Sequence, residues 1–205
     1  MNVRRIACVF LALVLSACQR GESASDESLG ARRGDSSQVA PSSTPDTVAL
    51  PDGRVLLALD GEGLRFVVAS TGSTRLLPFG MESAALITAV GTALAPPTSR
   101  GTSADCGAGP MDFATFAVGL SINIQHDRFV GWSTRASTTA VTLTTMSGIG
   151  VGSTRAALDA VYSATVSTTT LGEEFSAGGL AGVFDGPTAA ARITAMWAGT
   201  TCLAR

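Results

Sequence analysis

The sequence predicts an α+β fold made of two tandem units, each a helix followed by an antiparallel sheet of about three strands. Two observations indicate this fold. One is an internal repeat, and the other is a set of short segments with alternating apolar residues after each copy of it. The 205 residues divide into four expected parts: residues 1–18, residues 19–47, a first unit at 48–135 and a second at 136–205.

The repeat relates LPFGMESAALITAV at residues 77–90 to IGVGSTRAALDAVY at residues 149–162. Gly80 aligns with Gly152, and an Ala-Ala-Leu triplet follows each glycine after the same interval. Each copy has a loop that ends in glycine and then a run with helical character. We therefore expect one helix in each copy.

Strands are expected where apolar residues alternate with polar ones or where β-branched residues are frequent. The expected strands are 54–59, 63–68, 112–116, 120–124 and 129–132 in the first unit, and 140–146, 173–177, 179–184 and 192–197 in the second. Asp-Gly-Glu-Gly at residues 60–63 predicts a hairpin turn, and a second turn is expected at residues 125–128.

This order of glycine loop, helix and meander, at about residues 76–197, resembles β-lactamase inhibitor protein and the small lipoproteins of outer-membrane assembly. Cys-Gly-Ala-Gly at residues 106–109 and Trp-Ala-Gly-Thr-Thr-Cys at residues 197–202 also resemble segments of a group of bacterial lipoproteins to which no activity is assigned. The first resemblance implies a tandem fold with a sheet face open to a protein partner.

The N-terminus has the pattern of an export signal. Arg4 and Arg5 precede an apolar run at residues 6–15, which is shorter than the roughly 20 residues needed to span a bilayer. The run ends in Leu-Ser-Ala-Cys, which resembles the lipobox of bacterial lipoproteins. The resemblance implies that Cys18 carries fatty acyl chains such as palmitate, and that Gln19 directs the protein to the outer membrane. The alternative is a plainly secreted protein with an incidental cysteine.

Residues 19–47 are rich in Ser, Asp, Gly and Pro, a composition typical of a flexible tether. The formal net charge of the whole chain is −2, so nucleic acid is not a favoured partner. Every basic residue other than the single histidine is arginine, which excludes Schiff-base and P-loop lysine chemistry. The expected partners are the membrane, through the lipid anchor, and an envelope protein.

Four cysteines are present. Cys8 is removed with the export signal and Cys18 carries the lipid, so Cys106 and Cys202 remain as a pair in an oxidising compartment. Their simplest expected state is a disulfide. The alternative, a zinc site, would need about four ligands. His126 is the only histidine available for it.

Gly-Ile-Gly-Val-Gly at residues 148–152 invites comparison with a dinucleotide-binding loop. Such a loop needs a third glycine for helix packing, and Arg155 stands in its place. Because only Gly152 has a counterpart in the other copy of the repeat, a positive φ at the helix start explains the glycine better. Ser153 or Thr154 is the expected helix cap, and no nucleotide cofactor is predicted.

Catalytic residues are scarce. His126 could act with Asp127, or with Cys106 as nucleophile, as in semialdehyde dehydrogenases. That family opens with a dinucleotide motif, whereas this chain opens with the export signal. The paired carboxylates at residues 173–174 are expected on opposite faces of a strand, where they cannot hold a substrate together.

Trp132 and Trp197 end strands that occupy equivalent places in the two units. Packing residues are the ordinary interpretation, and an exposed position would make them anchors for a protein partner. The predicted function is therefore a lipid-anchored, non-catalytic binding or assembly-accessory module of the cell envelope. The alternatives are an enzyme of the dehydrogenase type and a purely structural envelope lipoprotein.

Overall fold

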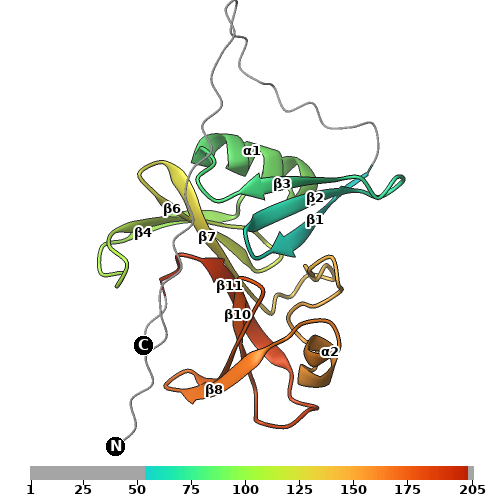
Figure 1. Ribbon diagram of the computed structural model, residues 1–205. Coiled ribbons are helices and arrows are strands. Elements are labelled where there is room, and N and C mark those ends of the chain that lie inside the picture. The colour runs from blue at the N-terminus through green and yellow to red at the C-terminus, as the bar shows by residue number, and fades with distance from the viewer. Residues whose placement is uncertain (1–53, 203–205) are drawn as a thin grey trace, which may run out of the picture. The chain divides into compact units, whose positions relative to one another are not determined.

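The computed structural model describes residues 54–202, which belong to a single compact unit and fold mostly as β-structure (Figure 1). The expected export signal, Cys18 and the tether lie outside the described residues. The helices are α1 (Ser83–Leu94) and α2 (Arg155–Asp159). The strands are β1 (Val55–Asp60), β2 (Gly63–Val68), β3 (Thr74–Pro78), β4 (Ser99–Ser103), β5 (Met111–Thr115), β6 (Leu120–Gln125), β7 (Arg128–Arg135), β8 (Thr165–Thr169), β9 (Gly172–Ala177), β10 (Leu180–Phe184) and β11 (Ile193–Gly199).

These strands form two antiparallel sheets. The smaller sheet has the order β1-β2-β3, and the larger has eight strands in the order β4-β5-β6-β7-β11-β10-β9-β8. Within the larger sheet β7 pairs with β11, so that Trp132 lies opposite Ala198 and Gly131 lies opposite Gly199. Residues before and after position 135 therefore share one continuous sheet, with β4 and β8 at its two edges (Figure 1).

The predicted α+β fold of two tandem helix-plus-meander units is wrong. The described residues form eleven strands in two antiparallel sheets of three and eight strands, and the two helices are short. α2 has only five residues, because the chain leaves the helix at Ala160 instead of continuing to Tyr162 as the repeat suggested. The meanders also pair edge to edge, which makes one large sheet instead of two small ones.

Most of the expected strands are confirmed, and three strands, β3, β4 and β8, were not expected. β4 and β8 carry mainly Ser, Thr, Arg and Gly and are largely exposed, so they lack the apolar alternation that marks a strand. The expected strand at 140–146 is wrong: apart from isolated bridges at Thr144 and Thr145, this segment has no strand. Its threonines favour extended backbone, but no neighbouring strand pairs along it.

One apolar core lies between the sheets and α1. Leu86, Ile87, Ala89 and Val90 form the buried face of α1, which packs mainly against β1 and β7. Leu59 and Leu64 of the small sheet belong to the same cluster of buried residues. Beyond β7, the edge strand β4 of the large sheet is largely exposed.

Candidate functional site

Gly80 and Gly152 precede the two helices and adopt the same left-handed backbone, with φ of +87° and +90°. The amide of Gly80 donates to the carbonyl of Phe129, and the amide of Gly152 donates to the carbonyl of Ile193. The prediction that Gly152 has a positive φ at the start of the second helix is confirmed. A side chain would be strained at such φ values, which accounts for glycine at both positions.

At each helix start, an arginine side chain donates a hydrogen bond to the carbonyl of the glycine. The guanidinium Nη1 of Arg128 donates to the carbonyl of Gly80 at 3.4 Å, and that of Arg192 donates to the carbonyl of Gly152 at 2.7 Å. Thr154 caps α2 by accepting from the amide of Ala157, as one of the two expected caps. The loop at residues 148–152 therefore uses its last glycine to start a helix.

The cap of α1 is an acidic residue. Glu82 accepts hydrogen bonds from the amides of Ala84 and Ala85 at 3.0 and 2.7 Å. These two bonds, with a smaller effect of the nearby Arg128 guanidinium, lower the pKa of the Glu82 carboxyl below its ordinary value. The first free amides of α1 are thus satisfied by the chain itself.

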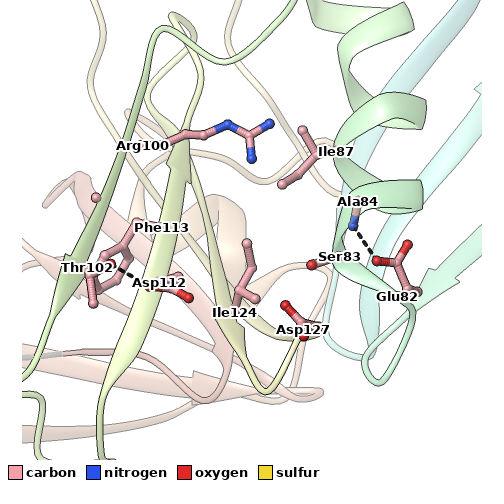
Figure 2. A pocket seen from close by; sticks show the side chains of 11 residues that line it. Glu82, Ser83, Ala84, Ile87, Arg100, Thr102, Asp112, Phe113, Ile124 and Asp127 are labelled. Atoms are coloured by element: carbon pink, nitrogen blue, oxygen red, sulfur yellow. Dashed lines mark hydrogen bonds between the residues drawn. The ribbon is translucent and has the colours of Figure 1, made fainter.

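Directly beside this cap lies the α1 cleft, a cavity of about 530 Å³ between the start of α1 and the strands β4, β5 and β6 (Figure 2). This volume is within the range of roughly 300–1,000 Å³ that is usual for ligand pockets. The lining residues are Glu82, Ser83, Ala84, Ile87, Arg100, Gly101, Thr102, Asp112, Phe113, Ile124 and Asp127. The cleft therefore combines apolar walls with three carboxylates and one guanidinium.

The charged groups lie at two ends of the cleft. Figure 2 shows Arg100 reaching from β4 toward Ile87 of α1, while Asp112 and Asp127 lie at the other end. Thr102 donates to Asp112 at 2.6 Å, which fixes that carboxylate on the β4–β5 pair. Within residues 54–202, the Asp127 carboxylate and the Arg100 guanidinium make no hydrogen bond or ion pair and are open to a ligand.

Ser83 is the polar residue most deeply placed in the cleft. It is only 8% exposed, and its hydroxyl points into the cavity toward Ile124 and Asp127 (Figure 2). Its backbone amide donates to the carbonyl of Asp127 at 2.9 Å, which holds the start of α1 against the β6–β7 turn. Among the described residues the Ser83 hydroxyl has no hydrogen-bond partner, and no side-chain polar atom buried from solvent is left unpaired there, so the hydroxyl is open to the cleft and a ligand can bind it.

The corresponding position at the second helix has a long basic side chain. Arg155, the first residue after the cap of α2, is in the same position as Ser83, and its amide donates to the carbonyl of Ala191 at 2.8 Å. Its guanidinium donates to the carbonyl of Pro187 at 3.1 Å and lies 3.7 Å from the Asp159 carboxylate. The two helix starts share backbone contacts and differ in the side chain in front of the helix.

Residues 199–202, here called the C-terminal strap, cross the other face of the large sheet. The carbonyl of Thr200 accepts from the buried side chain of Asn123 at 3.0 Å, and its amide donates to Val130 at 2.8 Å. A β-carbon on Gly131 would overlap the Thr200 carbonyl, so glycine is required beneath the strap. A second cavity of about 370 Å³, which includes Arg135, lies beside it.

The strap brings Cys202 to Cys106. Both cysteines are free thiols in this structure, Cys106 buried and Cys202 partly buried. A hydrogen bond between the two side chains is the main reason that the pKa of the Cys202 thiol is raised, and burial adds to it. The sulfurs are not bonded, so the disulfide stays a prediction, but the fold places the two thiols side by side.

The two tryptophans are buried, so they lack the exposure that anchors for a protein partner would need. Trp132 is completely buried and donates from Nε1 to the carbonyl of Asp60 at 3.0 Å, while Trp197 is 6% exposed. Both side chains pack inside the domain, and Trp132 links the large sheet to the turn after β1. The residues that line the α1 cleft take their place as candidates.

The residues considered for catalysis do not form one site in the described part of the chain. His126 lies exposed in the β6–β7 turn with φ of +50°, and no hydrogen bond within residues 54–202 links it to Asp127 or Cys106. Glu173 and Glu174 accept from Thr168 and Thr169 at 2.6 and 3.0 Å, respectively. These carboxylates therefore brace β8 against β9.

No group of three or more His, Cys, Asp or Glu residues in the described part of the chain could hold a metal ion. No helix in residues 54–202 is long and apolar enough to cross a membrane. Comparisons with protein-family models, with curated proteins and with solved structures find no match to this chain. The described residues form a mostly β domain of two antiparallel sheets with an open, charged cleft.

Sequence reasoning missed Ser83, Arg100 and Asp112 as site residues. None of the three belongs to a recognisable sequence motif, and β4 was not expected as a strand. The signal that could have found Ser83 was in the repeat, which aligns it with Arg155. A small polar residue opposite an arginine at otherwise matching helix starts indicates that the two copies differ at this position.

Proposed function

We propose that this protein is a lipid-anchored, non-catalytic module of the bacterial cell envelope that binds a protein partner in the α1 cleft. The observation that carries the proposal is the cleft itself, where the partly buried Phe113 lies with an unpaired carboxylate and an unpaired guanidinium. Apolar walls with a few placed polar groups are the usual composition of a binding site.

The envelope location rests on the sequence. The run that ends in Leu-Ser-Ala-Cys supports acylation at Cys18, and Gln19 supports the periplasmic face of the outer membrane. Several acyl chains give stable attachment, whereas a single chain gives only reversible attachment. Metabolic labelling with a palmitate analogue tests this part: we expect label on the wild-type chain and none after Cys18→Ser. Labelling of both chains would contradict it.

The cleft is tested by placing a photo-reactive amino acid at Thr102, which lines it, and separately at Asp159, which lies on α2 away from it. Both full-length variants are irradiated in intact envelopes of the bacterium that makes the protein. We expect a crosslinked species of defined mass with the first variant only. The same species from both positions, or none from either, would contradict binding in the cleft.

A further inference from the structure

We propose that the segment bound in the α1 cleft is positively charged, and that a lysine or arginine head group lies among Ser83, Asp112 and Asp127. Its aliphatic stem would lie against Ile87 and Ile124. This inference rests on the proposed function, because it names the chemistry of the partner at the same site.

The charge of the lining favours a cation. Three carboxylates line the cleft against a single guanidinium, and Figure 2 shows Asp112 and Asp127 on the two sides of Ile124, away from the Arg100 guanidinium. Glu82 is occupied by its two helix amides, which leaves the Asp112–Asp127 end as the more accessible acidic part. Carboxylates spread along a cleft attract an organic cation, and complementary potentials select a partner of opposite charge.

The hydrogen-bonding groups fit the same head group. Ser83 as a residue is only 8% exposed, and its hydroxyl points into the open cleft and has no hydrogen-bond partner within the described residues. A hydroxyl can accept from an ammonium or guanidinium, as the free carboxylate of Asp127 can. A cation at this place would therefore satisfy a polar group that the fold leaves open.

The apolar walls fit the stem of a long basic side chain. Ile87 comes from α1 and Ile124 from β6, and they lie on two sides of the cavity (Figure 2). Lysine and arginine pack their methylene groups on apolar surface while the charged head reaches polar partners. Arg100 at the far end would repel a second basic residue and can donate to a carbonyl of the bound segment.

The second helix start has a cation at the matching position. At the position of Ser83 the chain has Arg155, whose guanidinium donates to the carbonyl of Pro187 and lies 3.7 Å from the carboxylate of Asp159, one turn further along α2. The first helix has serine at this position, and carboxylates line the cleft beside it.

The test uses the full-length protein and three synthetic peptides: acetyl-Gly-Ser-Val-Lys-Val-Ser-Gly-amide and the same peptide with glutamine or with glutamate in place of lysine. Binding is measured by titration calorimetry at low and high salt. We expect the lysine peptide to bind best and the glutamate peptide not to bind. The substitutions Asp127→Asn and Asp112→Asn should each lower the affinity for the lysine peptide by about three- to fivefold, as loss of one exposed ion pair does.

Asp159→Asn is the matched control, because it removes an exposed carboxylate outside the cleft, and thermal melts check that every variant is folded. The inference is wrong if the peptides bind equally, if none binds at millimolar concentration, or if Asp127→Asn and Asp159→Asn have the same effect. If crosslinking through Thr102 persists while lysine selectivity is missing, the charge assignment fails and the proposed function stands. If crosslinking fails as well, both fail.

Discussion

Ser83 and Arg155 hold the same position at the starts of the two helices, one residue after the cap, and their side chains have different surroundings. The Arg155 guanidinium contacts Pro187 and Asp159, whereas the Ser83 hydroxyl faces an open cavity of about 530 Å³. The backbone contacts of the two positions are alike, so the two helix starts differ mainly in the side chain at this position.

Ser83→Arg should therefore close the α1 cleft from within. The arginine side chain would compete with the peptide for the Asp127 carboxylate, so binding of the lysine peptide should weaken by about three- to fivefold or more. Calorimetry measures the change, and Ser83→Ala serves as the control, since it leaves the cleft open. Equal affinity of wild type and Ser83→Arg would show that the peptide binds elsewhere.

Glu82→Gln should destabilise the fold at neutral pH and not in acid. The helix amides lower the pKa of the Glu82 carboxyl in the folded state, so its stabilisation is present above the unfolded pKa of about 4.3. It is lost as pH falls through the lower folded pKa. We expect a Tm lower by about 2–4 °C at pH 7, and a difference that shrinks below about pH 4. Melts across pH test this, and a constant difference would contradict it.

Oxidation should join Cys106 to Cys202 with little rearrangement of the backbone, because the two side chains are already neighbours. Formation of the bond removes two thiol hydrogens and requires an external oxidant such as a periplasmic dithiol oxidase. Mass mapping of non-reduced peptides should then show the pair. Reduction should lower the Tm by roughly 8–15 °C, since a loop of this length would no longer be closed. Two alkylatable thiols in protein purified from the periplasm would contradict the pairing.

Gly131→Ala should displace the C-terminal strap. The added β-carbon would overlap the Thr200 carbonyl, which Asn123 and Val130 also hold. We expect Cys202 to move from Cys106, so that disulfide formation in a glutathione buffer slows by about tenfold or more. Gly101→Ala is the control, since a β-carbon there meets no atom within 4 Å. Unchanged oxidation of Gly131→Ala would mean that the strap does not position the thiol.

The sequence predicted local structure better than the arrangement of the sheets. Alternating apolar residues located β6 and β7, and segments rich in apolar and β-branched residues located β1, β2, β10 and β11. β4 and β8 bury little, so periodicity could not locate them. Edge-to-edge pairing of β7 with β11 depends on contacts distant in sequence, and local patterns do not encode it.

The candidate site was harder to predict from the sequence than the fold. Glycines and a cap at each helix start could be predicted because special backbone geometry restricts the residue type, as at Gly152 and Thr154. The cleft depends instead on how α1 lies beside β4 and on which side chains have no partner. Trp132 and Trp197 were considered as anchors because aromatic residues are frequent in interfaces, but their strands point them into the core.

The central claim is that the α1 cleft holds a basic segment of a partner, and a nuclear magnetic resonance titration of the isotope-labelled full-length chain with the lysine peptide tests it most directly. The largest amide shifts should fall on Ser83, Arg100, Asp112 and Asp127, and the glutamate peptide should leave these signals in place. Shifts centred on α2 or on the strap, or equal shifts with both peptides, would contradict the claim.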